Sequence, residues 1–161
     1  MSLSSCLERL NLQSCIWFQN GEYRNAVASI VSGILFFMGW WFIIDVQVTC
    51  SDDFKGSFHL CGIFGTISLL MVNSVSNAVI RGNDFGGGSC GAKLWLFLGF
   101  VMGFASVIAA CWILFANFLL HEPGPNSKPL AVWVGAGLFL QNCFIFIASL
   151  VYKFGRVDDQ W

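Results

Sequence analysis

The chain has 161 residues and a formal net charge of -1, and 57% of its residues are hydrophobic while only 11% are charged. Soluble domains usually carry about a quarter charged residues, so this composition excludes an ordinary soluble domain. The near-neutral charge also gives no electrostatic basis for binding nucleic acid. With 17 Phe and 7 Trp, the composition indicates a single membrane domain over residues 1–161.

An N-terminal segment, residues 1–25, precedes the first apolar run. It has no uninterrupted apolar stretch of about 7–15 residues, so we expect no cleavable signal peptide and a first membrane helix that acts as a retained anchor. The segment is either an interfacial helix on the cytosolic leaflet or a disordered tail. The interfacial helix would carry these apolar residues on one face: Leu3, Leu7, Leu10 and Trp17.

Four apolar runs follow, each long enough to cross a hydrocarbon core of ~30 Å, which takes ~20 residues. Because no water is available there, every backbone N–H and C=O must be paired within its own segment, which favours helices. The third run, "WLFLGFVMGFASVIAACWILF", also lacks the alternation of a strand. The predicted fold class is all-α, a four-helix transmembrane bundle, with helices over about 26–48, 58–80, 94–120 and 130–153.

The Lys and Arg residues are distributed unequally between the two sides of this bundle. Two of the eight, Lys55 and Lys128, lie in the first and third loops. Positive charge in short loops marks the cytosolic side, so we expect both termini in the cytosol, including a tail over residues 154–161. The six residues on the expected cytosolic side are Arg9, Arg24, Arg81, Lys93, Lys153 and Arg156.

The stretch "GILFFMGWWFIIDVQV" places Asp45 at the far end of the first predicted helix, just after Trp40 and Trp41. Adjacent tryptophans are typical of a membrane–water interface. Asp45 is therefore either a helix end that reaches headgroup water or a buried partner for another helix. A catalytic role is disfavoured, because no second carboxylate is placed to pair with it.

Two of the seven cysteines, Cys50 and Cys61, fall on the non-cytosolic side, where a disulfide could join the first helix to the second. Free thiols are the alternative. His59 and His121 lie near acidic residues on the same side, but no pair has a recognised metal-ligand spacing. No nucleophile and base can be assembled on one side by spacing, so the sequence predicts no catalytic residues, no metal and no cofactor.

Polar and small residues inside the helices form the strongest interaction signal. Asn73, Asn77 and Arg81 are spaced to share one face of the second helix. An amide at mid-membrane depth needs a partner, so we expect Asn73 to bond to Gln141 or Asn142 of the fourth helix. These residues either only hold the bundle together, or dock another membrane protein, or line a polar path. Small residues that would permit close helix contacts complete the set: Gly99 and Gly103, and Ser29 and Gly33.

Six stretches recur in an order that is familiar from one group of proteins: "RNAVASIVSGILFFMGWWFIID", "VNSVSNAVIRG", "LWLFLGF", "WILF", "LQNCFIF" and "YKFGR". Together they resemble the transmembrane protein 50 family of small four-helix membrane proteins. The resemblance covers roughly residues 24–156, and the N-terminal tail, the first and third loops and the "DDQW" ending depart from it. Cys50 is not part of the family pattern, which weakens the case for the disulfide.

The resemblance implies protein sorting rather than catalysis. Family members are associated with endoplasmic reticulum, Golgi and endosomal membranes. Fungal relatives act in transport from late endosome to vacuole, with a second small four-helix protein of the leptin-receptor-gene-related type. We therefore expect a non-enzymatic sorting component that acts through helix–helix contacts. The family offers no catalytic residues, and the matching positions are candidates for interaction only: Asn73, Asn77, Arg81, Gln141, Asn142, Lys153 and Arg156.

Two functions from other classes stay open. A small-molecule or ion transporter, or a channel subunit, would need a water-filled route past the amide side chains. A lipid-modifying enzyme would need nucleophilic or metal-binding groups that converge at one membrane interface. The sequence names neither the cargo, the organelle nor the oligomeric state.

Overall fold

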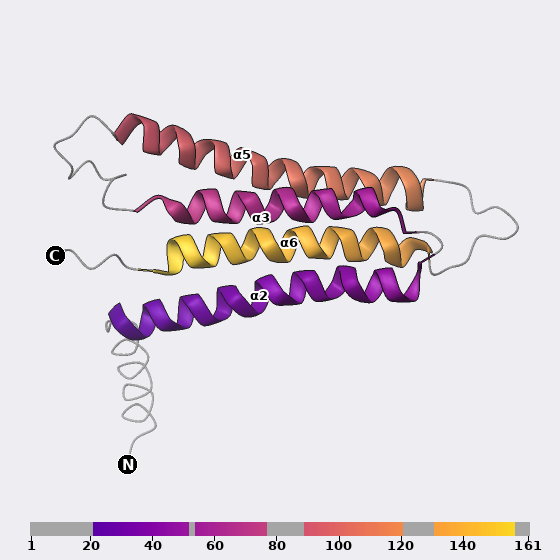
Figure 1. The fold of residues 1–161 in the computed structure, drawn as a ribbon, viewed down its shortest axis with the longest axis horizontal. Coiled ribbons are helices and arrows are strands. Elements are labelled where there is room, and N and C mark those ends of the chain that lie inside the picture. Colours follow the sequence, from indigo (N-terminus) through magenta and orange to yellow (C-terminus); the bar gives the residue numbers. More distant parts are fainter. Residues whose placement is uncertain (1–20, 52–53, 77–88, 121–130, 157–161) are drawn as a thin grey trace, which may run out of the picture.

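The structure is a computed structural model that describes residues 21–51, 54–76, 89–120 and 131–156. Four long helices, each running opposite to the one before it along the chain, form most of these ranges, as the hydropathy of the sequence predicts (Figure 1). Each of the four spans, the second of which runs over Gly56–Ser74, is apolar and long enough to cross a bilayer, so the all-α membrane fold is confirmed. The helices are α2 (Gly21–Thr49), α3 (His59–Ser74), α5 (Ser89–Ile113) and α6 (Ala131–Gly155). A short 3-10 turn, η1 (Gly56–Phe58), leads into α3, and a π-helical segment, η2 (Leu114–Leu119), continues α5.

The central helix is α6. It packs against α2, α3 and α5, and α3 also packs against α5. In Figure 1 the order across the molecule is α2, α6, α3, α5. Half of the most apolar stretch of α6 is buried inside the bundle, against 22–28% of the corresponding stretches of the other three spans. In contrast, α2 makes its extensive contacts with α6 alone.

We call the end at which α2 begins and α6 ends the Arg24 end, and the opposite end, where α2 ends, the Thr49 end. An apolar cluster closes the Thr49 end, because buried side chains from α2, η1, α5 and α6 meet there. Its buried members are Ile43, Val46, Cys50, Phe58, Ala110, Val134 and Leu138.

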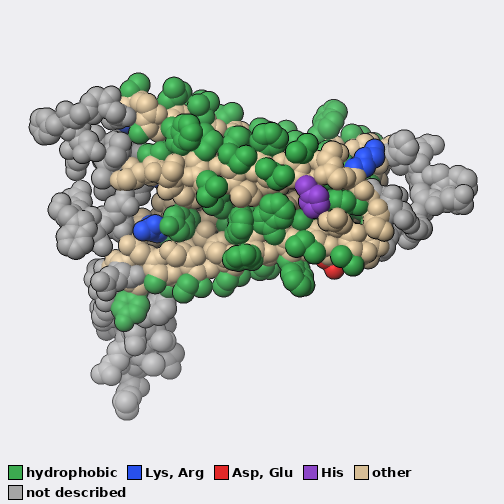
Figure 2. All heavy atoms as spheres, in the orientation of Figure 1, with side chains coloured by type: hydrophobic (Ala, Val, Ile, Leu, Met, Phe, Trp, Pro, Cys, Tyr) green, Lys and Arg blue, Asp and Glu red, His purple; other side chains and the backbone are tan. Residues whose placement is uncertain are grey.

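Hydrophobic side chains cover the visible face of the bundle, and Lys and Arg side chains gather near its two ends (Figure 2). Three helices carry an aromatic residue near each end: Tyr23 and Trp41 in α2, Trp95 and Trp112 in α5, and Trp133 and Tyr152 in α6. The members of each pair are 17–19 residues apart. At ~1.5 Å per residue this is roughly 26–28 Å, close to the ~30 Å hydrocarbon core.

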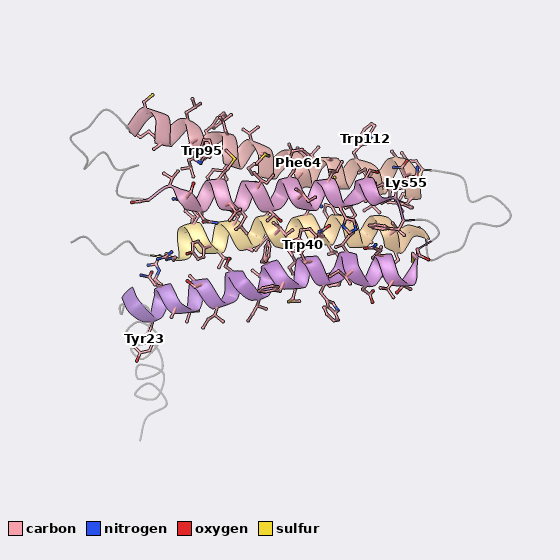
Figure 3. The ribbon with its side chains drawn as sticks, in the orientation of Figure 1. Tyr23, Trp40, Lys55, Phe64, Trp95 and Trp112 are labelled. Atoms are coloured by element: carbon pink, nitrogen blue, oxygen red, sulfur yellow. The ribbon has the colours of Figure 1, made fainter. Side chains whose placement is uncertain are left out.

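Because Trp and Tyr are enriched at membrane–water interfaces, we assign the two interfaces to the levels of these aromatic pairs. Figure 3 shows Tyr23 and Trp95 toward the Arg24 end and Trp112 with Lys55 toward the Thr49 end. On this assignment, residues beyond an aromatic pair lie at headgroup level, and residues between its members lie in the hydrocarbon.

The second helix is shorter than its apolar run suggests. The expected end was near residue 80, but α3 ends at Ser74, and Val75 has extended backbone angles (φ -92°, ψ 125°). Two hydrogen bonds, one from within α3 and one from α6, accompany this end. The Ser74 hydroxyl donates to the Met71 carbonyl (2.8 Å), and the Lys153 ammonium from α6 donates to the Val75 carbonyl. Such bonds give the last carbonyls partners other than the next helical turn.

Cys50 and Cys61 are not joined by a disulfide, so of the two alternatives that the sequence leaves open, the disulfide is the one that the structure contradicts. Cys50 is buried in the apolar cluster of the Thr49 end, and Cys61 packs against the same cluster. Here both act as small apolar side chains, a common use of buried cysteine.

Candidate functional site

The central feature of the interior is a polar face on α6. Gln141 and Asn142 are completely buried, Ser149 is 2% exposed and Lys153 is 6% exposed. These four residues recur along the side of α6 that meets α3 and α5. Polar groups in lipid are costly unless they are paired, so their placement inside the bundle identifies α6 as the helix that the others enclose.

Gln141 is the least satisfied residue of this face. Neither its Oε1 nor its Nε2 has a hydrogen-bond partner, and both atoms are buried. The amide packs directly on Gly62 of α3, where the Cβ of any larger residue would overlap it. The glycine therefore makes room for a long amide side chain between the two helices.

Asn142, the next residue, is better paired. Its Nδ2 donates to the Leu138 carbonyl of the preceding turn (2.9 Å), while its Oδ1 is buried without a partner. Gly65 of α3 faces this amide, since a Cβ there would lie 3.4 Å from both Asn142 Oδ1 and Ser106 Oγ. Asn142 of α6 and Ser106 of α5 thus bring polar atoms to one point in the interior, beside Gly65 of α3.

The contact between α3 and α5 uses the glycines that the sequence singles out. Gly99 and Gly103 lie on the buried side of α5. A Cβ at Gly103 would lie 2.6 Å from Ser68 Oγ, and one at Gly99 would lie 3.0 Å from a Val72 methyl. Ser68 itself donates a 2.6 Å hydrogen bond to the Gly99 carbonyl. The GxxxG pair therefore lets the two backbones approach and bond across the helix interface.

Asn73 does not bond to Gln141 or Asn142 as the sequence predicts. Its Nδ2 donates to the Leu69 carbonyl of its own helix (2.8 Å). The expected depth was wrong because α3 ends at Ser74, so Asn73 lies in the last turn and near the Arg24 end. Asn77 and Arg81 lie outside the described residues, beyond the helix whose face they were expected to share with Asn73.

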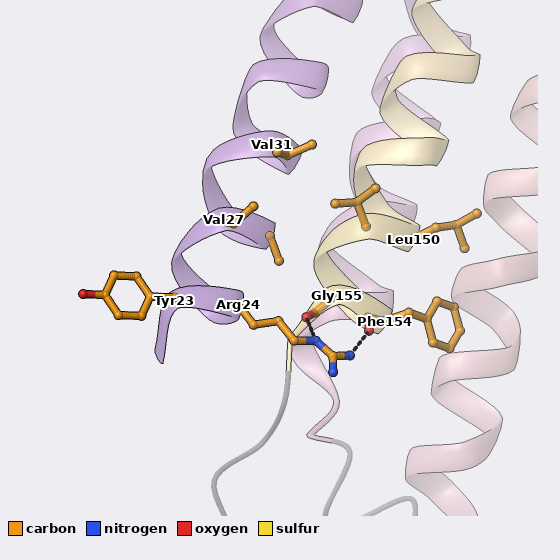
Figure 4. Close-up of a pocket in the computed structure, with 9 residues that line it drawn as sticks. Tyr23, Arg24, Val27, Val31, Leu150, Phe154 and Gly155 are labelled. Carbon is orange, nitrogen blue, oxygen red and sulfur yellow. Dashed lines mark hydrogen bonds between the residues drawn. The ribbon is translucent and has the colours of Figure 1, made fainter. Parts of the chain in front are cut away.

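Arg24 joins the first and last helices at the Arg24 end. Its Nε donates to the Gly155 carbonyl (2.9 Å) and its Nη2 to the Phe154 carbonyl (3.4 Å), as Figure 4 shows. These carbonyls belong to the last turn of α6, where the helix dipole also stabilises a cation. A groove of about 550 Å³ between α2 and α6 opens beside this contact, with Val27, Val31 and Leu150 in its walls.

The expected small-residue contact of α2 is absent from the described part of the bundle. Ser29 is exposed, and its hydroxyl donates to the Asn25 carbonyl of its own helix (2.9 Å). A Cβ added at Gly33 would meet nothing within 4 Å. The close contacts of α2 with α6 are made elsewhere: Ser32 donates to the Ala148 carbonyl (2.8 Å). Ser29 and Gly33 instead lie on an outer face that we call the open α2 face, formed by Ser29, Ile30, Gly33, Ile34, Phe37, Met38 and Trp41.

Asp45 also lies on the exposed surface of α2, not in the core. It follows Trp41 by four residues, so it lies one helical turn beyond the aromatic residue that marks the interface. In the described ranges, no three His, Cys, Asp or Glu side chains converge as they would to hold a metal ion.

Sequence reasoning missed three buried serines, Ser32, Ser68 and Ser149. The only signal was a small polar residue within an apolar run, which is too common to distinguish a helix contact from a solvated site. It also did not anticipate that Lys153, a candidate for interaction, would be almost completely buried.

Comparison with known proteins agrees with this architecture. A family model described as "Uncharacterised protein family (UPF0220)" matches residues 6–161. A relative from Dictyostelium discoideum, "Transmembrane protein 50 homolog", is 35% identical over 145 residues, which is 81% of this chain and 91% of the relative. No solved structure matches the chain. The matches to the family model and to this relative, together with the four apolar helices, show that the chain belongs to the transmembrane protein 50 family.

Proposed function

We propose that this protein is a non-enzymatic component of protein sorting that binds a partner membrane protein through the open α2 face. The observation that carries the proposal is the uneven packing of α2. This helix packs extensively only on α6, and its outer face has open space at Gly33, followed one and two turns further on by the large exposed side chains of Phe37 and Trp41. Small residues beside large apolar ones are typical of helix–helix contacts within membranes.

The family resemblance gives this contact a biological setting. Sorting in the endosomal and secretory pathway, toward the vacuole or lysosome, is the role that the fungal relatives imply. The partner that we propose is a second small four-helix membrane protein of the leptin-receptor-gene-related type. Endosomal, Golgi or endoplasmic reticulum membranes would then hold the protein, with both termini in the cytosol.

Sorting assays with matched variants test this function. In cells that lack the protein, wild type should restore delivery of a newly made hydrolase to the lysosome or vacuole. The double variant Phe37→Ala/Trp41→Ala removes two large side chains of the open α2 face and should fail to restore it. The control, Ile108→Ala/Trp112→Ala, removes an equally spaced exposed pair from α5. Equal rescue by the two double variants would contradict the proposal.

A transporter is the second candidate function, and one observation favours it. Gln141, Asn142 and Ser149 keep buried polar atoms without hydrogen-bond partners, and Lys153 continues this row to headgroup level. Such a row is typical of a path for protons or small polar solutes. Flux assays in proteoliposomes decide between the two, since a transporter should move solute that a Gln141→Leu variant does not.

A further inference from the structure

Two hollows on the same side of the bundle join near the Arg24 end. The first is a groove of about 620 Å³ between α2 and α3. The second is a smaller pocket of about 230 Å³. Asn73, Ser74 and Tyr152 line both, so the groove opens directly into the pocket. This site is separate from the open α2 face, although Ser29 and Gly33 border both.

The groove suits an apolar chain despite its hydroxyl groups. The Ser32 hydroxyl donates to the Ala148 carbonyl and the Thr66 hydroxyl to the Gly62 carbonyl, each at 2.8 Å. The hydroxyls of Ser29 and Ser74 likewise donate to backbone carbonyls of their own helices. Because these four hydroxyl protons are already used, the hydroxyl groups need no hydrogen bonds from a ligand. Asn73 and Tyr152 add polar groups only where the groove meets the pocket, and the rest of its lining is apolar, with Phe36, Leu69 and Leu70 among the residues.

The pocket has the opposite character. Lys153 and Arg156 supply two positive charges, and Ser76 and Tyr152 line the pocket with them. Arg156 is held in place, since its Nη1 donates to the Tyr152 hydroxyl (2.6 Å) and its guanidinium carbon lies 4.9 Å from the centre of the Tyr152 ring. The pocket therefore presents cations and hydrogen-bond donors at fixed positions.

The aromatic pairs place these two hollows in the membrane. Tyr152 marks the interface at the Arg24 end of α6, and Lys153 and Arg156 follow it toward the headgroups. The Trp95 indole of α5 donates to the Ser74 hydroxyl (3.1 Å), which puts the mouth of the pocket at the same level. The groove runs from there into the hydrocarbon.

We propose that the groove and the pocket together bind one anionic phospholipid of the surrounding bilayer. One acyl chain lies between α2 and α3, and the phosphate lies beside Lys153 and Arg156. Charge complementarity at headgroup depth, followed by an apolar groove at acyl-chain depth, is what such a molecule requires. With the orientation proposed above, the site faces the cytosolic leaflet, which is rich in anionic lipids.

Native mass spectrometry of the full-length chain tests this site without any partner protein. The protein is held in detergent micelles that contain equal amounts of phosphatidylserine and phosphatidylcholine with identical dioleoyl chains. Wild type should retain phosphatidylserine in preference. Arg156→Gln should lower that preference about fivefold, the effect of one surface charge worth ~1 kcal/mol. The control Lys93→Gln removes an exposed cation from α5, near the same interface but outside both hollows, and should change nothing.

Two further arms separate the acyl chain from the headgroup. Leu70→Trp fills the groove and should lower retention of phosphatidylserine with both charges intact, whereas Leu98→Trp on α5 should not. Glycerophosphoserine, which has the headgroup and no acyl chains, should bind far more weakly. The proposal is overturned if wild type shows no preference for phosphatidylserine, or if Lys93→Gln acts like Arg156→Gln. It is equally overturned if Leu70→Trp has no effect on the retention of phosphatidylserine, which is the result expected if a protein segment fills the groove. Binding of glycerophosphoserine as tightly as of the lipid would also overturn it.

Discussion

The hydroxyl of Ser68 in α3 donates a 2.6 Å hydrogen bond to the backbone carbonyl of Gly99 in α5. This carbonyl belongs to the glycine that begins the GxxxG pair, and the second glycine, Gly103, leaves room for Ser68 Oγ. The bond and the close approach depend on each other, because a larger residue at position 103 would push the serine away. The interface between α3 and α5 is thus specified by one hydroxyl and two missing side chains.

Gly103→Ala should therefore destabilise the bundle. The added Cβ would lie 2.6 Å from Ser68 Oγ and 2.9 Å from the Phe146 ring. Overpacking of this kind costs about 1–3 kcal/mol in the free energy of unfolding. Denaturation in detergent measures the change. Gly33→Ala is the control, because its Cβ meets nothing within 4 Å and alanine favours the helix by about 0.5–1 kcal/mol. Equal losses from both variants would contradict this account of the interface.

Gln141→Met should leave stability unchanged or raise it. The amide of Gln141 is fully buried and has no hydrogen-bond partner, so its removal relieves a desolvation cost of about 1–3 kcal/mol. Methionine keeps a similar length and adapts to the space beside Gly62. The same denaturation assay measures the effect, and Gln141→Glu, which buries an acid of equal length, should lower stability. A marked loss with methionine would mean that the amide holds a ligand or a water molecule in the native protein.

Asp45→Asn should change the free energy of unfolding by less than about 0.5 kcal/mol, as usual for a surface substitution. The carboxylate is exposed one turn beyond Trp41, in the region that we assign to lipid headgroups. Ile43→Ala, two residues away, should cost about 2–5 kcal/mol because Ile43 is completely buried. If Asp45→Asn approached the loss of Ile43→Ala, Asp45 would have a partner that its exposure does not reveal.

Both termini should be accessible from the cytosol. The four antiparallel spans bring the start of α2 and the end of α6 to one side. Among the described residues, Arg24, Lys93, Lys153 and Arg156 lie at that end and Lys55 at the other, a distribution that favours cytosolic termini. Epitope tags at either terminus should react with antibody after selective permeabilisation of the plasma membrane. A tag between residues 121 and 130 should stay protected, and the reverse pattern would invert the proposed orientation.

Hydropathy was sufficient to predict the number and type of the helices, because only a paired backbone survives in lipid. It could not predict where α3 ends, since the apolar run continues past Ser74 and the end involves hydrogen bonds at Ser74 and Val75, one of them from the distant Lys153. The depth assigned to Asn73 failed for the same reason. Because the helix was expected to end near residue 80 and ends at Ser74, the depth expected for Asn73 was in error by more than a helical turn.

The small residues show a second limit. Gly103 and Gly33 look alike in the sequence, as members of small-xxx-small pairs, yet Gly103 packs against Ser68 and Gly33 faces open space. Such a pattern indicates that a helix can approach closely, but not whether the partner helix belongs to the same chain. The cysteines show the same limit, because position on one side of the membrane cannot distinguish a disulfide from apolar packing.

The central claim, that the open α2 face binds a partner membrane protein, is tested most directly by site-specific photo-crosslinking in intact membranes. A photoreactive phenylalanine analogue would replace Trp41 on α2 or, as the control, Trp112 on α5. The two tryptophans are 72% and 73% exposed and belong to the same interfacial level, so they differ mainly in the helix that carries them. The proposal predicts a discrete protein adduct from position 41, identified as a leptin-receptor-gene-related membrane protein, and only lipid adducts from position 112. Lipid adducts alone from position 41, or the same protein adduct from both positions, would contradict it.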